Sequence, residues 1–403
     1  MKHIIILGDG MADEPLKEFG NKTPLQMAHK PHIDWLAKNG QNGLFKTVPE
    51  TMPPGSEIAN MAVMGYDVEK VYEGRGVLEA ASMGVVIEEN DLALRCNLIC
   101  VEDEKIKNHS AGHISTEEAG ELIQYLNKSF GNEIIKFYPG VSYRHLLVIK
   151  NGIKDIICTP PHDVMGTAFK DVLVESKSVE ANSTTDLLNY MIVRSRFLLE
   201  NHPVNQKRKA QGKDMANFIW PWSPGYKPAM QTFKEMFGIE KSAVISAVDL
   251  IQGIGVYAGM DVIKVEGATG LYDTNYEGKA KAAVDALKDH DFVYLHIEAS
   301  DEAGHEGDVE LKTKTIEYLD QRVVKYIIEK TAEMDEEVSI AVLPDHPTPC
   351  AIKTHTREAI PFIIYRKGID ADKVEVYDEF AARKGIYGTI KGNEFIKAFL
   401  GIY

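Results

Sequence analysis

The sequence predicts an α/β fold, in which a mainly parallel sheet flanked by helices is interrupted by a smaller inserted α+β domain. Uninterrupted apolar runs such as 4–7 are typical of strands buried on both faces of a parallel sheet. These strands alternate with helical segments, as in folds with helices on both sides of a sheet. Between 88 and 178 the predicted strands are short, and the breaks at Pro139-Gly140 and Pro160-Pro161 fit a separate α+β unit. We therefore expect a core formed by 1–87 and 179–403, with 88–178 inserted.

The first part of the core begins with a strand over 4–7 that ends at Gly8-Asp9-Gly10. Thr23 followed by Pro24 predicts a helix start, because a capping residue precedes Pro at the first helical position. A second helix is expected over 33–39, ending at Gly40. After a Pro-Gly loop, Ser56 begins a segment with the apolar spacing of a helix.

The insertion contains one clear amphipathic helix, capped near Ser115 and Thr116. Strands are predicted there over 143–149 and 171–174. Beyond the insertion, strands are expected over 243–248, 292–297, 338–343 and 362–365. A long helix over about 312–330 presents one apolar stripe, formed by Ile316, Leu319, Val323 and Ile327.

The composition argues against a nucleic-acid-binding, membrane or secreted disulfide-rich protein. The 403 residues include 45 Lys and Arg against 60 Asp and Glu, a net charge of −15. An acidic chain without a basic run argues against nucleic acid or an anionic membrane as the main partner. No apolar stretch has the length of a membrane span or a signal-peptide core. Four cysteines without a CxxC pair are too sparse for a secreted disulfide scaffold, so we expect a cytoplasmic protein (Cys96, Cys100, Cys158, Cys350).

Candidate metal ligands follow three of the predicted strands. Asp9 follows the first, Asp301 and His305 follow 292–297 with helical i, i+4 spacing, and Asp345-His346 follow 338–343, with His355 in the next loop. Each alone has an ordinary alternative as a turn residue, a cap or a solvated helix face. Sites in open α/β sheets form at the carboxyl ends of strands, so their joint occurrence there favours convergence.

The ligand types indicate the metal class. Carboxylates and imidazoles without thiolate favour Mn²⁺, Mg²⁺ or Zn²⁺ in an open site. Six such ligands exceed the needs of one four-coordinate ion, so two ions are expected, an arrangement suited to phosphoryl displacement. Ser56 supplies a candidate nucleophile, although a lone serine there is more often an ordinary N-cap. A helix start also offers N–H groups to a phosphate.

Other motifs carry less weight. Gly253-x-Gly255-x-x-Ala258 matches the dinucleotide fingerprint only formally, because four residues separate it from the preceding strand. No GxxxxGK[ST] loop is present. Trp220-Pro221-Trp222 is interpreted as packing, with a pocket wall as the alternative, and 207–209 as a solvated basic patch.

The chain resembles the cofactor-independent phosphoglycerate mutases of archaeal type, within the alkaline phosphatase superfamily. The resemblance covers nearly the whole chain and implies an alkaline-phosphatase-like core. Its motifs are Gly8-Asp9-Gly10, Pro54-Gly55-Ser56-Glu57-Ile58-Ala59-Asn60, Gly65-Tyr66-Asp67, Tyr72-Glu73-Gly74-Arg75-Gly76, Gly267-Ala268-Thr269-Gly270, Asp273-Thr274-Asn275-Tyr276, Asp301-Glu302-Ala303-Gly304-His305, Pro344-Asp345-His346 and Thr354-His355-Thr356.

The resemblance implies specific roles. Ser56 carries the phosphoryl group during interconversion of 3-phosphoglycerate and 2-phosphoglycerate, a step of glycolysis and gluconeogenesis. Two divalent ions are implied, with Mn²⁺ favoured over Mg²⁺ or Zn²⁺. One set of ligands is Asp9, Ser56, Asp345 and His346, and the other is Asp301, His305 and His355.

The inserted domain is expected to cover the site and grip the substrate carboxylate. Candidate residues are His113, Arg144 and Asp163 and, from the core, Arg75 and Lys279; a plain surface role is the alternative for each. His113 stands where these mutases have Arg, and the Trp220-Pro221-Trp222 cluster is unfamiliar in them. Both departures are similar to a bacterial branch proposed to act as homoserine kinases in threonine biosynthesis.

The predicted enzyme is therefore a phosphoglycerate mutase acting on a small phosphorylated substrate, with no nucleic acid or membrane partner. A homoserine kinase or a metal-dependent phosphohydrolase is the alternative within the same chemistry. A metal-stabilised binding protein without turnover is the alternative outside it. The oligomeric state is open, and a homo-oligomer is compatible with the sequence.

Overall fold

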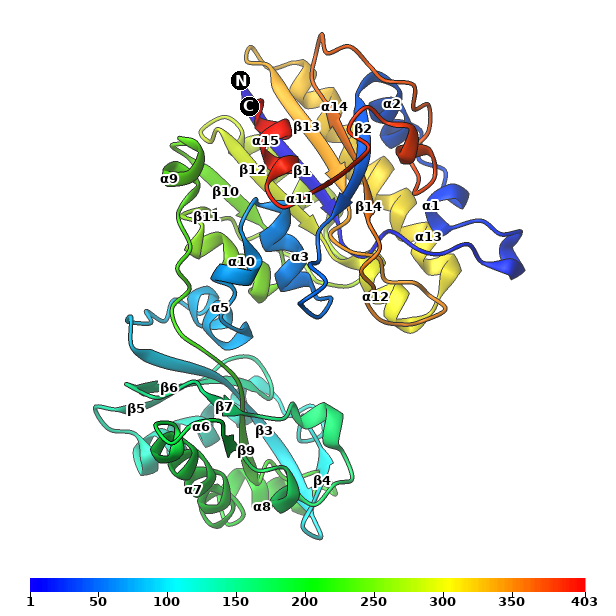
Figure 1. Cartoon of the computed structure of the whole chain (residues 1–403). Coiled ribbons are helices and arrows are strands. Elements are labelled where there is room, and N and C mark those ends of the chain that lie inside the picture. Colours follow the sequence, from blue (N-terminus) through cyan, green and yellow to red (C-terminus); the bar gives the residue numbers. More distant parts are fainter. Residues whose placement is uncertain (403) are drawn as a thin grey trace. The chain divides into compact units, whose positions relative to one another are not determined.

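The computed structural model describes residues 1–402, and the chain divides into two compact units (Figure 1). The larger unit combines Met1–Tyr72 with the residues from Ala229 onward, and the smaller unit is Glu73–Pro228. An insertion was expected over 88–178, and the compact unit extends beyond that range at both ends. The physical reason is strand pairing, because a strand at 218–225 completes the smaller unit's sheet.

The larger unit is built on an eight-stranded sheet. Five neighbouring strands run parallel, the next is antiparallel to both its neighbours, and the last pair is again parallel. The spatial order is β11 (Asp261–Val262), β10 (Ser242–Ile245), β12 (Phe292–Ile297), β1 (Lys2–Gly8), β13 (Val338–Leu343), β14 (Ile360–Tyr365), β2 (Gln41–Lys46) and β15 (Thr389–Lys391). This confirms the predicted mainly parallel sheet.

Helices cover both faces of this sheet (Figure 1). Ile4 and Ile6 of the central strand belong to an apolar core shared with α2, α11, α13 and α14. On the other face, α15 stacks Phe395 on Phe45 and sets Phe399 against His3. The helices are α1 (Pro24–Met27), α2 (Pro31–Asn39), α3 (Ser56–Val63), α4 (Val68–Val71), α9 (Phe233–Phe237), α10 (Asp249–Tyr257), α11 (Tyr276–Ala286), α12 (Ala299–Glu306), α13 (Val309–Tyr318), α14 (Lys325–Ala332) and α15 (Glu394–Leu400), with 3₁₀ turns at Lys17–Phe19 and Ala381–Lys384.

The helix expected over 312–330 is present as a longer helical run. It comprises α13, a π-helical segment at Leu319–Val324, and α14. All four residues of its predicted apolar stripe are buried. The predicted stripe is therefore confirmed.

The smaller unit has an antiparallel sheet with its own apolar core. Its long strand β3 (Asp91–Glu102) pairs with β6 (Arg144–Lys150), β9 (Phe218–Gly225) and, near its end, β4 (Lys105–Asn108), while β5 (Ile135–Tyr138) pairs with β6. The remaining elements are α5 (Arg75–Ser82), α6 (Thr116–Phe130), α7 (Asn182–Leu199), α8 (Pro203–Ala210), the pair β7 (Ile156–Ile157) and β8 (Glu175–Ser176), and 3₁₀ turns at Pro161–Val164 and Phe169–Val172.

Two predictions in this unit were wrong. The strand expected over 171–174 is absent, because Phe169–Val172 forms a 3₁₀ turn that buries only Phe169. The patch 207–209 is not wholly solvated: Arg208 is 2% exposed, and it donates to the Ala111 carbonyl and pairs with Glu118. Ser115 caps α6 as expected.

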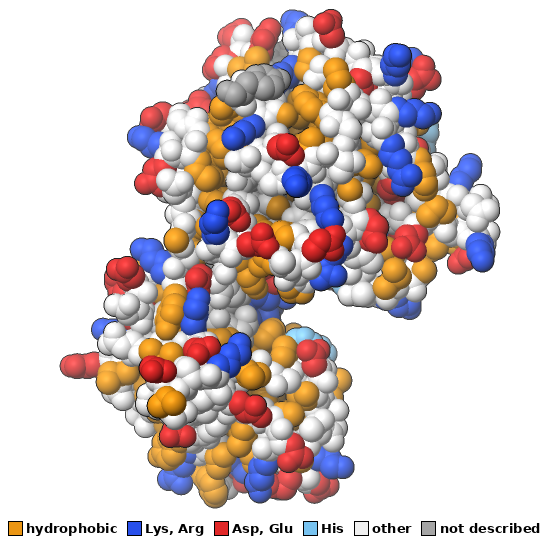
Figure 2. Space-filling view, in the orientation of Figure 1, with side chains coloured by type: hydrophobic (Ala, Val, Ile, Leu, Met, Phe, Trp, Pro, Cys, Tyr) orange, Lys and Arg blue, Asp and Glu red, His pale blue; other side chains and the backbone are white. Residues whose placement is uncertain are grey.

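The packing interpretation of the tryptophans and the rejection of the dinucleotide motif are confirmed. Trp220 and Trp222 are buried in β9, as the packing interpretation requires. Gly253 and Gly255 lie within α10, where no phosphate-binding turn exists. Figure 2 shows basic and acidic side chains intermingled on the visible face of each unit, without a basic field. Among the described residues, no helix is long and apolar enough to cross a membrane.

Candidate metal and phosphoryl-transfer site

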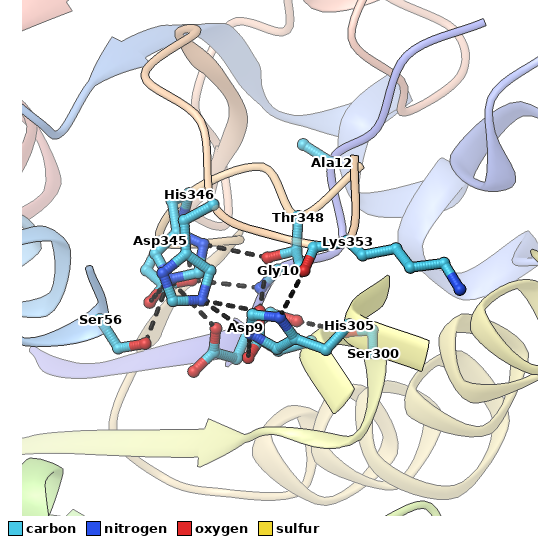
Figure 3. A network of polar contacts seen from close by, with 12 residues as sticks. Asp9, Gly10, Ala12, Ser56, Ser300, His305, Asp345, His346, Thr348 and Lys353 are labelled. Atoms are coloured by element: carbon cyan, nitrogen blue, oxygen red, sulfur yellow. Dashed lines mark hydrogen bonds and ion pairs between the residues drawn. The ribbon is translucent and has the colours of Figure 1, made fainter. Parts of the chain in front are cut away.

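The predicted ligands meet at one edge of the main sheet. Asp9 directly follows β1, Asp301 lies in the first turn of α12 after β12, and Asp345 and His346 follow β13. Because β12, β1 and β13 are adjacent and parallel, their carboxyl ends lie together. Figure 3 shows the side chains of Asp9, Asp345 and His346 pointing toward one another, with Ser56 beside them.

The first group comprises Asp9, Asp345 and His346, whose ligand atoms lie within 4.8 Å of one another. His346 Nε2 is 3.3 Å from Asp345 Oδ2 and 3.7 Å from Asp9 Oδ1. It is also 3.1 Å from the hydroxyl of Ser56. All three ligand candidates are at most 1% exposed, so the group is closed to solvent except near Ser56.

The second group comprises Asp301, His346 and His355, again within 4.8 Å. His355 Nε2 is 3.5 Å from Asp301 Oδ1. His305 joins this group: its Nε2 lies 3.2 Å from Asp301 Oδ2 and 3.0 Å from His355 Nε2. The predicted i, i+4 pair is therefore on one helical face, and His346 stands between the two groups.

Burial and like charge make the first group electrostatically crowded. Burial, together with the charges of Asp345 and Asp301, raises the pKa of Asp9 well above its usual range. Burial also acts to raise the pKa of Asp301, but hydrogen bonds from His305 and His355 outweigh it and hold that pKa well below its usual range. The bond to Asp301 raises the pKa of His305 to about 9. A cation would relieve the repulsion around Asp9.

The donor set fits a divalent cation. Asp9 Oδ1 is buried and has no hydrogen-bond partner among the described residues, although it faces the ligand atoms of the first group. A buried carboxylate oxygen without a partner is costly unless a cation takes it. Carboxylate and imidazole ligands without thiolate suit Mn²⁺, Mg²⁺ or Zn²⁺. The two groups are therefore candidate divalent-metal sites.

Ser56 is the first residue of α3, as the apolar spacing predicted. The N-cap itself is Gly55, and the Ser56 side chain makes no capping bond, so its hydroxyl is available to the site. One turn later, Asn60 donates to the Ser56 carbonyl at 2.8 Å and to Asp345 Oδ2 at 2.8 Å. Asn60 thereby couples the helix start to the first group.

Four supporting residues were missed by the sequence analysis. Tyr294 donates to Asn60 Oδ1 at 2.6 Å, and His296 contacts Asp9 Oδ2 at 2.9 Å. Thr348 hydrogen-bonds Asp301 and lies 3.2 Å from His346 Nδ1. Asn60 appears in a quoted motif but had no assigned role. Tyr294 and His296 lie inside a strand whose sequence is typical of a buried core. The polar side chain of His296 was the only signal that could have indicated a role in the site.

Within the smaller unit, the substrate-binding candidates lie near a cluster of aromatic rings. Tyr143 contacts the rings of His109 and His113, and His162 contacts His109 and Trp222. Asp163 is exposed and lies 3.6 Å from His162. Arg144 begins β6, directly after Tyr143, and is also exposed. His109 and His162 were not among the sequence candidates.

Arg75 was assigned to the core by sequence and belongs instead to the smaller unit. It begins α5, which packs on β3 and β9, and its backbone N–H donates to Ser223 Oγ at 3.0 Å. Lys279 does lie in the larger unit. It is 1% exposed, donates to the Thr269 carbonyl at 3.3 Å, and burial lowers its pKa to about 8.

Curated relatives decide the family. The chain is 51% identical over 98% of both sequences to the 2,3-bisphosphoglycerate-independent phosphoglycerate mutase of Methanosarcina acetivorans. It is 49% identical over 95% of both chains to the probable 2,3-bisphosphoglycerate-independent phosphoglycerate mutase of Geobacter sulfurreducens. The chain belongs to the 2,3-bisphosphoglycerate-independent phosphoglycerate mutase family. The family's model, of the same description, matches residues 37–205. The relationship confirms the resemblance to the archaeal-type enzymes.

Solved structures agree with this mutase fold. The PH0037 protein from Pyrococcus horikoshii is similar with a TM-score of 0.84 and 30% identity, covering 100% of this chain and 98% of its own. The cofactor-independent phosphoglycerate mutase from Thermoplasma acidophilum gives a TM-score of 0.71 and 27% identity, with both chains fully covered.

Proposed function

We propose that this chain interconverts 3-phosphoglycerate and 2-phosphoglycerate through a phosphoserine at Ser56. The observation that carries the proposal is the position of the Ser56 hydroxyl, 3.1 Å from His346, the residue shared by both ligand groups. The naming of relatives at about 50% identity over nearly their full length supports the same reaction.

The reaction requires two balanced transfers. Ser56 Oγ attacks phosphorus, the bond to the glycerate oxygen breaks, and the proton lost by Ser56 is balanced by the one gained by glycerate. The other glycerate hydroxyl then attacks the phosphoserine, and Ser56 recovers its proton. Asn60 holds the helix start that positions Ser56 through both transfers.

The two groups would hold two divalent ions, with Mn²⁺ favoured. Asp9, Asp345, His346 and Ser56 would serve one ion, and Asp301, His305 and His355 the other. Bound divalent ions supply positive charge that lowers the pKa of a serine hydroxyl and stabilises the transferring phosphoryl group. The chain's contribution is to hold these ligands together, with Asp9, Asp301, Asp345 and His346 buried and the other three partly exposed.

The smaller unit would cover the site and hold the glycerate carboxylate. Arg144, His113 and Arg75 are cationic or polar groups of the kind that binds carboxylates. Asp163 would receive a glycerate hydroxyl, and Lys279 would face the phosphoryl group from the larger unit. Holding glycerate in a covered site favours its second attack over attack by water.

The decisive experiment follows phosphate and product together. The metal-loaded protein is mixed with 3-phosphoglycerate, quenched within a turnover and examined by mass spectrometry. We expect 2-phosphoglycerate as product and one phosphate on Ser56. Ser56→Ala should abolish turnover while leaving folding intact, whereas Ser129→Ala, on the exposed face of α6, should leave turnover unchanged.

Other outcomes identify the alternatives. Product formation from homoserine and ATP, without mutase activity, would show the kinase and overturn the proposal. Release of free phosphate alone would show a phosphohydrolase. No turnover on any substrate would favour a binding protein. Repeating the assay after adding Mn²⁺, Mg²⁺ or Zn²⁺ to metal-stripped protein tests the ion, with Mn²⁺ expected to give the highest rate.

A further inference from the structure

Three buried side chains, those of Asp9, His296 and Ser246, form a hydrogen-bonded line. Ser246 Oγ lies 3.1 Å from His296 Nδ1, and His296 Nε2 lies 2.9 Å from Asp9 Oδ2. They come from the ends of β10, β12 and β1, which are neighbours in the sheet. His296 is fully buried, Asp9 is 1% exposed and Ser246 is 5% exposed. The line is therefore shielded from water along its length.

The hydrogen bonds of Ser246 indicate which atoms donate and which accept along this line. Ser246 Oγ accepts from the Val248 N–H at 3.0 Å, at the start of α10. Its own O–H remains to donate, and His296 Nδ1 lies 3.1 Å away to accept it. A neutral imidazole that accepts at Nδ1 carries its proton on Nε2 and donates there. When a cation holds Asp9 as a carboxylate, which can only accept, this tautomer of His296 is the one that donates to it.

Because of this bond, the two carboxylate oxygens of Asp9 have different roles. Oδ2 is taken by His296, whereas Oδ1 faces the first ligand group and has no hydrogen-bond partner among the residues described. The Asp9 backbone is also held, because Ser300 Oγ donates to its carbonyl at 2.5 Å. With one oxygen occupied, the carboxylate cannot rotate to offer both to a cation without losing the His296 bond.

We propose that His296, oriented by Ser246, is a positioning residue that makes Asp9 a one-oxygen ligand and so sets the cation affinity of the Asp9–Asp345–His346 group. Partners of this kind behind a ligand hold its orientation and tune its basicity. The inference rests on the proposed function for the assignment of these residues as metal ligands, but not on the identity of the substrate.

The second group has a different support. Asp301 is bonded by Thr348, His305 and His355, whereas the hydrogen bonds of His296 go to Ser246 and Asp9. A defect at His296 is therefore expected to weaken one cation and spare the other. A residue that only stabilised the fold would not discriminate between the two groups.

The test measures cation binding directly. Metal-stripped full-length protein is titrated with Mn²⁺, and free Mn²⁺ is followed by electron paramagnetic resonance. The natural chain is expected to bind two ions. His296→Phe should weaken one of them by about 10–100-fold and leave the other unchanged. His305→Ala should weaken the opposite one, which assigns the two binding steps to the two groups.

Two further variants keep the test informative if His296→Phe does not fold. Ser246→Ala removes only the group that orients His296 and should weaken the same ion by a smaller factor. His296→Gln retains an N–H donor and should restore part of the affinity. Each variant is first checked for folding by its thermal transition.

Contrary results are clear. Unchanged affinity in folded His296→Phe and Ser246→Ala, equal weakening of both ions, or fewer than two ions bound by the natural chain would each overturn the inference. Failure of the proposed function gives a different pattern. A natural chain that binds two Mn²⁺ but forms no 2-phosphoglycerate would refute the mutase assignment while the site-selective effect of His296 persisted.

Discussion

Lys312 Nζ donates to Asp13 Oδ2 across 2.8 Å, and both side chains are fully buried. The same ammonium donates to the carbonyls of Ala12 at 3.1 Å and Thr348 at 2.8 Å. Asp13 Oδ2 in turn accepts from the Cys350 N–H at 3.0 Å. This ion pair therefore joins the loop after β1, which carries Asp9, to the loop after β13, which carries Asp345, His346 and His355.

Removing one partner of this pair is expected to cost more than removing both charges. Lys312→Met leaves a buried carboxylate without its cation and should lower the free energy of unfolding by about 3–5 kcal/mol. Lys312→Met combined with Asp13→Asn removes that uncompensated charge and should recover about half of the loss, since two carbonyls stay unpaired. Urea unfolding of metal-stripped protein measures both.

A surface pair provides the control. Lys281 and Asp285 pair one helical turn apart on the exposed side of α11. Lys281→Met should leave the urea midpoint unchanged. If Lys312→Met were equally silent, the buried pair would have no role in joining the two loops.

Gly10 is expected to tolerate no side chain. Its φ is +62°, and a Cβ there would lie 2.6 Å from Asp301 Oδ1 and 2.8 Å from the Asp301 backbone. Gly20 has a similar φ of +69° with no atom within 4 Å of the added carbon. Gly20→Ala should therefore show only the backbone cost, about 1–2 kcal/mol. Gly10→Ala should lose cation binding as well.

Mn²⁺ titration and urea unfolding separate the two effects. Loss of cation binding in both variants would mean that the left-handed conformation matters rather than the close approach to Asp301. Full binding in Gly10→Ala would contradict the prediction that Gly10 lies too close to Asp301 for a side chain to fit.

Removing the bound cation should lower the stability of the protein, whereas replacing the Asp9 carboxyl group should raise the stability of the cation-free protein. Mn²⁺ at 100 times its dissociation constant should add about 2.7 kcal/mol to the stability of the natural chain. Asp9→Asn keeps an oxygen for His296 but removes a buried carboxyl group whose raised pKa reflects the cost of ionising it there. The cation-free variant should therefore melt about 2–4 °C above the cation-free natural chain, and Mn²⁺ should stabilise it less.

Thermal melts with and without a chelator give these four values. A cation-free Asp9→Asn protein that melts below the natural chain would show that repulsion in the first ligand group is already relieved without a cation.

Acid should destabilise the smaller unit through His145. This side chain is buried in β6, its Nδ1 accepts from the Gly140 N–H at 3.0 Å, and burial lowers its pKa from 6.5 to about 3. Below pH 6.5, His145 is therefore protonated in the unfolded chain but stays neutral in the folded unit. His145 contributes stability that is complete above pH 6.5 and falls by about 1.4 kcal/mol per pH unit toward pH 3.

Tryptophan fluorescence can follow this unit selectively. Trp220 and Trp222 lie in the smaller unit and Trp35 in the larger, so the measurement is made in a Trp35→Phe background. His145→Gln keeps an acceptor for Gly140 and should flatten the pH dependence of the unfolding midpoint between pH 6.5 and 4. An unchanged slope would assign the acid sensitivity to other groups.

Much of the core and of the candidate site could be predicted from local patterns. Apolar strand runs predicted β1, β12 and β13, and the polar residues that follow each run predicted where ligands would meet. The i, i+4 spacing of Asp301 and His305 needed only helical geometry. Ser56 at a helix start likewise followed from the residues beside it in the chain.

The failures came where the neighbours were distant. The strand expected over 171–174 has the right composition but no partner strand, so it turns instead. Arg208 appeared solvated because its partners, Glu118 and the Ala111 carbonyl, lie some 90 residues away in sequence. The end of the smaller unit was misplaced for the same reason, because β9 pairs with β3 across more than 100 residues.

Residue types and their order along the chain were thus enough to establish which side chains reach the sheet edge, since parallel strands align their carboxyl ends whatever connects them. Only the tertiary structure decided what supports those ligands. His296 and Lys312 read as ordinary strand and helix residues until folding brings them against Asp9 and Asp13. Hydrogen bonding depends on separations of about 3 Å in space, and no local pattern encodes those for residues nearly 300 positions apart.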